Sequence, residues 1–156
     1  MGVLMRIIIF VLMIISSVFS EQYVFLVKKY DKEIEFEAKI ISKIASSSVK
    51  EKIKLYIPKI SKQEKDIYSE YFYLTKDCKS ANFIFDNKGL LNEKCKKLNK
   101  LYFTNNYRRL ISNTKYYGAF FWNKSRPNIV FIKQRLEQYN VKLSKEYLKY
   151  IEDINE

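Results

Sequence analysis

Two cysteines, Cys78 and Cys95, are the residues with the most definite chemistry in this chain. In an exported protein the simplest product of such a pair is one disulfide that closes a short loop. A reactive dithiol is the rival hypothesis, but the pair lacks C-x-x-C spacing and the sequence has no histidine to activate a thiolate. Two buried free thiols are the third alternative. The sequence favours the structural disulfide.

The absence of histidine also limits the catalytic sites that this chain can build. Neither Ser–His hydrolysis nor a histidine-ligated zinc or copper site is open to it. Gly89 and Gly118 stand alone, far from any glycine-rich phosphate loop. Carboxylate pairs such as Glu35 with Glu37 lie on predicted helices, where solvated surface is the simplest interpretation. We therefore expect that the protein is not an enzyme and that it binds no metal ion and no other cofactor.

The aromatic and basic residues of the chain indicate a binding function and not a catalytic one. The single tryptophan, Trp122, is closely followed by Arg126, and these two residue types are enriched at the hot spots of protein interfaces. The candidate interface comprises Tyr117, Phe120, Trp122, Arg126, Pro127 and Asn128. The alternative is that Trp122 packs on a neighbouring helix of its own domain and Arg126 only decorates a turn.

A second candidate site, for a ligand, is Thr104, Asn105 and Asn106. These residues lie between a predicted strand and the helical stretch 107–111. Helix N-termini at the carboxyl ends of parallel strands commonly bind anions. Ordinary helix capping is the competing role for the same side chains.

The element that must position the candidate interface is the segment Tyr116–Ile132, which is typical of a β-hairpin. Two apolar runs, Tyr117–Trp122 and Asn128–Ile132, flank the polar segment Asn123–Asn128. Neither run alternates between polar and apolar residues, so we expect protein to cover both faces of the ribbon. Gly118 inside the first run indicates a bulge or a close backbone approach.

The remaining pattern alternates strands and helices. We expect strands over residues 53–57, 81–85 and 100–104, and helices over residues 34–48, 61–73, 90–98, 107–111, 132–140 and 144–154. Residues 23–30 fit either a short strand or the start of a helix. Alternation at this spacing indicates right-handed crossovers. The expected fold is a three-layer α/β domain with a mainly parallel, Rossmann-like sheet, a C-terminal antiparallel hairpin and helices on both faces.

The first residues, Met1–Ser20, resemble a secretory signal peptide. Arg6 supplies the positive region and Ile7–Ile15 the apolar region, with a small-residue cleavage site before Glu21. An uncleaved membrane anchor is the alternative, although the apolar run is shorter than the roughly 20 residues that a spanning helix needs. We therefore expect export to the periplasm and one mature domain over residues 21–156.

The formal net charge is +12, and a basic protein gains affinity for nucleic acids and anionic membranes. Lysine is, however, spread through every segment, and the chain is also rich in Ile, Asn and Tyr. An A+T-rich genome produces that bias without any binding function. Because export separates the protein from nucleic acid, we expect no nucleic-acid partner. If the positive charge serves binding, the outer face of a membrane is the best candidate for the surface that the protein binds.

The order of motifs from Cys78 onward resembles the YfiR-like periplasmic domain family. The residues that carry the resemblance are CKSANFIFD, then LYFTNNYRRLI, then YYGAFFWNKSRPNIVFI, and the closing NVKLSKEYLKYIE. It spans roughly residues 33–151. It rests on the pattern of elements, since there is no invariant catalytic motif.

The resemblance implies an α/β fold and a non-catalytic periplasmic role. Family members are similar to repressors that bind the periplasmic sensor domain of a membrane-bound diguanylate cyclase and lower cyclic-di-GMP synthesis, and related domains precede sensor kinases. This chain has two cysteines where the redox-responsive member has two pairs, and it lacks the aromatic-proline signature after the first helix. The expected partner is therefore a membrane-bound signalling protein, a cyclase or a kinase. A homodimer is also compatible with the sequence, as is the alternative function of a periplasmic small-molecule or anion binder.

Overall fold

A computed structural model describes residues 28–154 of the chain. The predicted signal peptide and its cleavage site lie outside these residues. The chain divides between Phe36 and Glu37 into two units, of which the structure describes residues 28–36 and residues 37–154. Residues 28–36 of the first unit are helical, so a helix replaces the strand alternative at positions 28–30. Within the described residues, none of the helices has the length and apolar character needed to cross a membrane.

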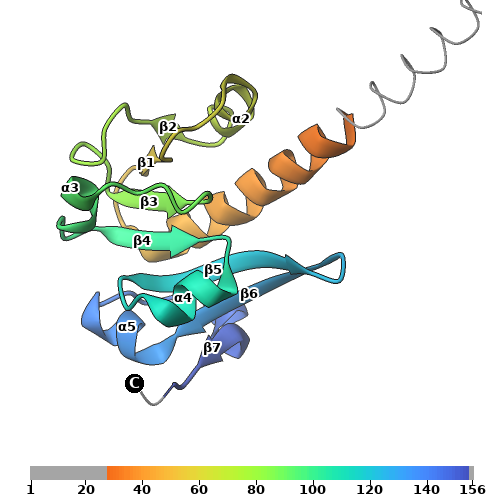
Figure 1. The fold of residues 1–156 in the computed structure, drawn as a ribbon. Helices are drawn as coiled ribbons and strands as arrows, with labels where there is room; N and C mark the ends of the chain where they lie inside the picture. The colour runs from red at the N-terminus through yellow and green to blue at the C-terminus, as the bar shows by residue number, and fades with distance from the viewer. Residues whose placement is uncertain (1–27, 155–156) are drawn as a thin grey trace, which may run out of the picture. The chain divides into compact units, whose positions relative to one another are not determined.

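The second unit is built on a seven-stranded sheet with the order β2-β1-β3-β4-β5-β6-β7 (Figure 1). The strands are β1 (Lys54–Tyr56), β2 (Tyr73–Leu74), β3 (Phe83–Asp86), β4 (Leu101–Thr104), β5 (Tyr116–Asn123), β6 (Arg126–Ile132) and β7 (Ile151–Glu152). The helices are α2 (Lys62–Tyr68), α3 (Glu93–Lys96), α4 (Tyr107–Ser112), α5 (Lys133–Gln138) and the 3₁₀ helix η1 (Lys145–Tyr150), in addition to helical residues 37–48. Among the described strands, β1 to β5 pair in parallel, as do β6 and β7, and β5 pairs antiparallel with β6. The expected α/β fold with a mainly parallel sheet and one antiparallel hairpin is confirmed.

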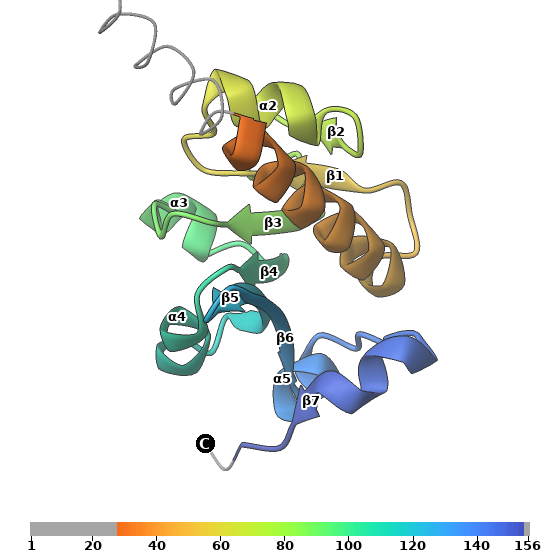
Figure 2. The same ribbon diagram turned by 90° about the vertical axis from the view of Figure 1, so that its right-hand side faces the viewer.

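Helices cover both faces of the sheet. Successive residues of a strand point to opposite faces, so Ile84 and Phe85 of β3 report on the two sides. Ile84 lies in an apolar cluster with Cys95 of α3. The ring of Phe85 lies 6.2 Å from the ring of Tyr68 in α2, measured between centroids. Figure 2 shows α3 and α4 on one side of the sheet and helical residues 37–48 on the other.

Aromatic rings fill the face that α2 covers, and a glycine makes room for them. Rings in mutual contact there are Phe83, Phe85, Phe103, Tyr117 and Phe131, joined by Tyr68 and Tyr147. A Cβ atom on Gly118 would lie 2.6 Å from Cε2 of Phe103 and 2.7 Å from Cδ1 of Phe131. The close approach that the sequence indicated at Gly118 is confirmed. Rings from β4 and β6 meet directly over β5 at this position.

The helix predicted over residues 61–73 is too long. The structure ends α2 at Tyr68 and starts it with a capping box, in which Ser61 Oγ accepts from the amide of Glu64 and the Glu64 carboxylate accepts from the amide of Ser61. Tyr73 and Leu74 instead form β2, which pairs with the outer side of β1. This strand was missed, because two residues carry too little pattern to be recognised as a strand.

The helix predicted over residues 144–154 is also wrong in part. Ser144 precedes η1 but makes no side-chain cap, and Leu148, in the middle of the predicted helix, is 54% exposed. Ile151 and Glu152 form β7, which pairs in parallel with β6. Strand pairing there satisfies backbone groups at the edge of β6, and this outweighs the weak helical pattern of the sequence.

The disulfide between Cys78 and Cys95 is confirmed, with a distance of 5.7 Å between the two Cα atoms. Cys95 lies in α3, which is shorter than the helix predicted over residues 90–98 and is capped by Asn92, whose Oδ1 accepts from the amide of Cys95. The bond joins α3 to the loop that enters β3. By chain entropy a loop of this length stabilises the fold by about 3 kcal/mol.

The strand order identifies where such a sheet usually binds ligands. The chain leaves β1 outward to β2 and then returns past β1 to β3, so its direction reverses between β1 and β3. This is the doubly wound order 2-1-3-4-5, in which the loops at the carboxyl ends of the strands flank a crevice at the reversal. The loops after β1 and β3 are therefore a second candidate site, in addition to the hairpin.

Candidate functional site

The hairpin of β5 and β6 extends past the rest of the sheet (Figure 1). Pairing between β4 and β5 ends at Thr104 with Ala119. In the described part of the chain, β5 beyond Ala119 pairs with β6 alone, and β6 pairs with β7 only at Phe131 and Ile132. Residues 120–129 thus form a two-stranded ribbon, here called the hairpin arm.

The structure buries two residues of the candidate interface and leaves the other four at least partly accessible. Tyr117 and Phe120 are fully buried. Trp122 is 45% exposed, Arg126 and Pro127 are exposed, and Asn128 is half-buried. The expectation that protein covers both faces of the whole ribbon is therefore wrong for its outer half, because that half leaves the region that the helices cover.

The exposed residues lie on both faces of the hairpin arm, because neighbouring residues of a strand point to opposite faces. Trp122 and Pro127 are direct cross-strand partners, and Asn123 pairs with Arg126 at the turn. The Trp122 ring packs edge-to-face on Phe120, with 6.0 Å between centroids. This contact orients the indole from the buried core outward.

The turn at the tip of the arm is tighter than the sequence indicated. Only Lys124 and Ser125 connect the strands, with φ angles of 47° and 61°. Both residues are in the left-handed region, as a two-residue type I′ hairpin turn requires. The polar segment predicted to be loop over residues 123–128 is mostly strand, because Pro127 occupies a position on β6 away from the sheet interior.

The three residues of the predicted ligand site have separate tasks. Thr104 is fully buried and donates from Oγ1 to the carbonyl of Asp86. Asn106 caps α4, with its Oδ1 accepting from the amide of Arg109. The side chain of Asn105 hydrogen-bonds to Glu37. The helix that they precede, α4, has 6 residues. So few peptide dipoles add up to only a small positive charge at its N-terminus.

A buried polar cluster lies at the ends of β3 and β4, on the α4 side of the sheet. Tyr116 donates its hydroxyl to Oδ2 of Asp86 at 2.6 Å, and the amide of Leu90 donates to Oδ1. Arg109 Nη1 donates to the carbonyl of Asp86 and to Oγ1 of Thr104. Burial and the Asp86 carboxylate together raise the pKa of Tyr116 well above its usual value. The polar groups named here have partners, so the cluster's task is to hold the loops.

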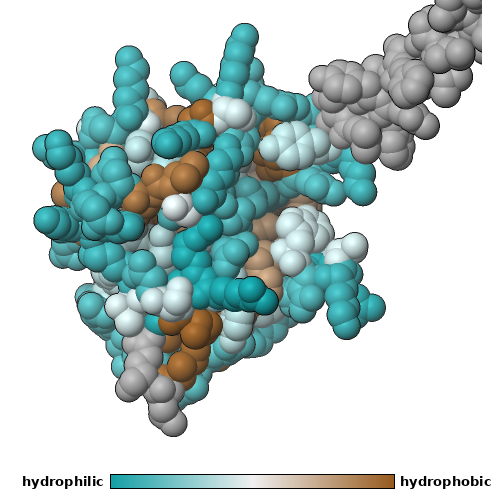
Figure 3. Space-filling model, in the orientation of Figure 1, coloured by the Kyte–Doolittle hydropathy of each residue, from teal (hydrophilic) through white to brown (hydrophobic). Residues whose placement is uncertain are grey.

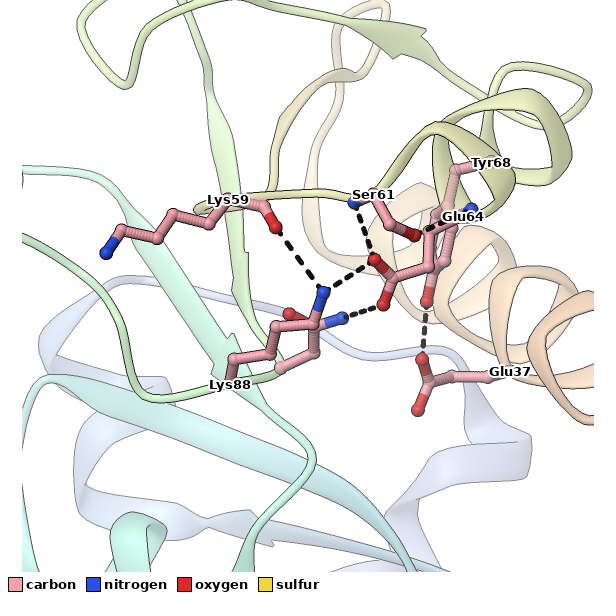
Figure 4. A network of polar contacts seen from close by, with 7 residues as sticks. Glu37, Lys59, Ser61, Glu64, Tyr68 and Lys88 are labelled. Carbon is pink, nitrogen blue, oxygen red and sulfur yellow. Dashed lines mark hydrogen bonds and ion pairs between the residues drawn. The ribbon is translucent and has the colours of Figure 1, made fainter. Parts of the chain in front are cut away.

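A second polar cluster lies at the reversal point between β1 and β3 (Figure 4). Lys88, in the loop after β3, donates to Oε2 of Glu64 at 2.7 Å, and its Nζ also reaches the carbonyl of Lys59 at 3.4 Å. Asn87 donates to the other carboxylate oxygen of Glu64. Burial acts to raise the pKa of Glu64, but the hydrogen bonds from Lys88 and Ser61 outweigh it, and the pKa is lowered.

Glu37 adds a carboxylate with the opposite behaviour to this reversal-point cluster. It accepts a hydrogen bond of 2.7 Å from the hydroxyl of Tyr68. Burial raises the pKa of Glu37 above its usual value, and bonds from Tyr68 and Asn105 only partly offset this. Burial raises the pKa of Tyr68 as well, so this hydroxyl remains a donor at any ordinary pH.

Sequence reasoning missed both polar clusters. A signal was present, because Asp86, Asn87 and Lys88 come directly after an apolar strand that was predicted to be parallel. Polar residues at that position mark the carboxyl end of a sheet. Their partners, Glu64 and Arg109, had no signal, since each lies on a helix where charged residues are ordinarily solvated.

Taken together, the fold and these sites describe a doubly wound α/β domain with a projecting hairpin. No group of three or more metal-ligating side chains is found among the described residues. No family model, no curated protein and no solved structure matches the chain.

Proposed function

We propose that this protein is a non-catalytic periplasmic regulatory domain that binds the periplasmic part of a membrane signalling protein, a diguanylate cyclase or a sensor kinase, through its hairpin arm. The observation that carries the proposal is the exposure of Trp122, Arg126 and Pro127 on an arm that extends past the sheet. The arm thus presents a tryptophan with a large apolar area and an arginine with a directed charge, two residue types that are enriched at the hot spots of protein interfaces.

The location outside the cytoplasm has independent support. The signal-like residues 1–20 indicate export. The Cys78–Cys95 disulfide is typical of an oxidising compartment. The resemblance to the YfiR-like family indicates the same compartment and the same class of partner.

The arm itself supplies the test. A photo-crosslinking amino acid placed at Lys124, at the tip, should crosslink in whole cells to a membrane protein that carries a cyclase or kinase domain. The same amino acid at exposed Lys145, on η1, is the matched control and should give no such product. Recovery of the same products from both positions, or of no membrane signalling protein from Lys124, would refute the proposal.

Two substitutions separate binding from folding. Trp122→Ala and Arg126→Ala should each abolish the Lys124 crosslink and lower the free energy of unfolding by no more than about 1–2 kcal/mol, because Arg126 is exposed and Trp122, though it packs on Phe120, is 45% exposed. Chemical denaturation of the purified variants measures the second quantity. A loss of several kcal/mol would assign Trp122 to the core instead.

The alternative function, binding of a small molecule, is favoured by one observation at the reversal-point cluster. Oδ1 of Asn87 is buried and has no hydrogen-bond partner among the described residues. A ligand that donates a hydrogen bond there would satisfy it. Thermal shift against envelope metabolites, compared between the wild type and Asn87→Ala, tests this alternative, since a bound ligand raises the apparent stability.

A further inference from the structure

Two hollows adjoin at the β2 edge of the sheet, away from the hairpin arm. One has a volume of about 480 Å³ and lies beside β1, β2 and the loop after β2. The other, of about 430 Å³, lies between the end of β1 and α2. Leu74, Thr75 and Lys76 line both of them. The two hollows are here together called the β2-edge groove, and the first has room for a ligand the size of a sugar phosphate or nucleotide.

Positive charge is concentrated in this groove. Its lysines are Lys52, Lys54 and Lys76 in the first hollow and Lys59, Lys65 and again Lys76 in the second. Among the described residues that line the two hollows, Asp77 is the one carboxylate. That is a ratio of 5 to 1, whereas the whole chain has 29 basic and 17 acidic residues. The even spread of lysine that the sequence suggested does not hold at this edge.

The lone carboxylate does not neutralise these lysines. Oδ1 of Asp77 accepts from the amides of Lys79 and Ser80, and Oδ2 accepts from the hydroxyl of Ser80. Those bonds, led by the Ser80 amide, hold the pKa of Asp77 below its usual value. Within the described residues, the five groove lysines make no ion pair with any carboxylate. Their ammonium groups remain available to an anion from solvent.

The backbone beneath the lysines is fixed by specific bonds. Oδ1 of Asn82 accepts from the amide of Lys54 at 2.8 Å, and Nδ2 of Asn82 donates to the carbonyl of Lys52 at 3.0 Å. The amide of Thr75 donates to the carbonyl of Leu55 at 2.8 Å. These bonds fix both walls of the first hollow, so binding would order the lysine side chains but not the loops.

An exposed ring completes the groove. Tyr73 is 59% exposed and is the cross-strand partner of Lys54. The ammonium of Lys52 lies 5.7 Å from the centre of its ring. A flat or apolar group of a ligand can pack on Tyr73 while its anionic group meets the lysines. Figure 3 shows long hydrophilic side chains projecting over the part of the surface where β1, β2 and α2 lie.

We propose that the β2-edge groove is a binding site for a phosphorylated ligand, with Lys52, Lys54 and Lys76 holding the phosphate and Tyr73 packing on the rest. Phosphate is the anion class that fits best, because three lysines line one hollow and a multiply charged group can meet more than one of them. The site is separate from the hairpin arm, so a phosphorylated ligand and a protein partner can bind at once.

Isothermal titration of the mature protein with pyrophosphate, and with ADP as a probe that adds a flat group, tests the proposal. We expect ADP to bind more tightly than pyrophosphate and both affinities to fall with added salt. The triple variant Lys52→Ala, Lys54→Ala, Lys76→Ala should weaken both by about tenfold or more. Tyr73→Ala should weaken ADP alone. None of these side chains is buried, so the variants should fold.

A charge-matched control separates a site from general surface charge. Lys94, Lys97 and Lys145 are exposed and lie outside the groove. Their triple alanine variant removes the same charge and should keep the affinity within about twofold, since long-range charge alone is screened by salt. Equal losses in the two triple variants, or no binding of either probe, would overturn the proposal.

The phosphate could belong to a free metabolite or to a lipid headgroup, and vesicles distinguish the two. Sedimentation with phosphatidylglycerol vesicles, compared with phosphatidylcholine vesicles, reports a lipid source if the groove variant loses binding and the control variant keeps it. Probe binding without vesicle binding assigns a free metabolite. Vesicle binding that survives in the groove variant would place the lipid elsewhere and count against the groove as a headgroup site.

Discussion

At the scale of single residues, the pair of Lys88 and Glu64 makes a definite prediction about pH. Glu64 is buried and its pKa is lowered, so the pair contributes stability above the ordinary pKa of a glutamate, and this is lost as the pH falls through the lowered value. Lys88→Ala should lower the free energy of unfolding by about 1–3 kcal/mol at pH 7, because it leaves a buried carboxylate short of a donor. Urea denaturation at pH 7 and pH 3 measures the difference, which should shrink at pH 3.

The exposed pair of Lys96 with Glu93 is the control for that prediction. It has the same separation of 2.7 Å, but its glutamate is solvated. Lys96→Ala should cost at most about 0.5 kcal/mol. Glu37 changes stability in the opposite sense. Its pKa is raised, so it contributes stability below the ordinary pKa of a glutamate, and this contribution is lost as the pH rises through the raised pKa. The quantity to compare is therefore the difference in free energy of unfolding between the wild type and each variant, taken at the same pH. A cost for Lys88→Ala that is the same at both pH values would contradict it.

Gly118 gives a second prediction at the residue scale. Its Cβ would lie 2.9 Å from the carbonyl oxygen of Val130 as well as against two buried rings. The backbone atom cannot move without disturbing the pairing of β5 with β6. Gly118→Ala should therefore lower the free energy of unfolding by about 1–3 kcal/mol, as overpacking does. Thermal and urea denaturation measure it, and an unchanged midpoint would show that the sheet gives way more easily than the contacts indicate.

At the scale of elements, the hairpin turn is strained because its two residues have left-handed backbone conformations and neither is glycine. Ser125 has a φ of 61°, where a residue with a Cβ is disfavoured and glycine is not. Ser125→Gly should raise the free energy of unfolding by about 0.5–1 kcal/mol. Ser112→Gly, at the end of α4, is the control and should lower it. A destabilised Ser125→Gly variant would mean that the turn adopts another conformation in solution.

The sequence predicted well the elements that carry their own residue pattern, and poorly those that form only through tertiary pairing. The strands around Ile84 and Tyr102 and the hairpin were recognised because each carries a run of apolar or β-forming residues between polar turns. Tyr73–Leu74 and Ile151–Glu152 were missed because they become strands only through pairing with β1 and β6. Pairing of this kind is a tertiary effect, which overrides a local helical pattern.

The sites were less predictable than the fold, for a related reason. Trp122 and Arg126 could be proposed from residue type alone, and the structure exposes both. The β2-edge groove could not, because its lysines come from segments that the fold brings together around a strand the sequence did not reveal. Lys52 and Lys76 line one hollow because β2 pairs with β1.

At the scale of the whole molecule, the fold predicts uneven protection of its backbone amides against hydrogen exchange. Strands β3 and β4 are central, flanked by paired strands, and buried by helices on both faces. The outer part of the hairpin arm has β6 as the one described partner of β5. Amides of β3 and β4 should exchange only through global unfolding, and those of residues 121–125 through local opening.

The difference should be large. For a domain with a stability of at least about 5 kcal/mol, the two sets of amides should differ in exchange rate by a factor of about 10³ or more. Exchange followed by mass spectrometry of the free protein measures it, and the Lys100–Thr104 peptide is an internal reference. Equal protection in both segments would mean that the arm packs against protein in solution. In that case the exposure of Trp122, on which the proposed partner surface rests, would not describe the free molecule.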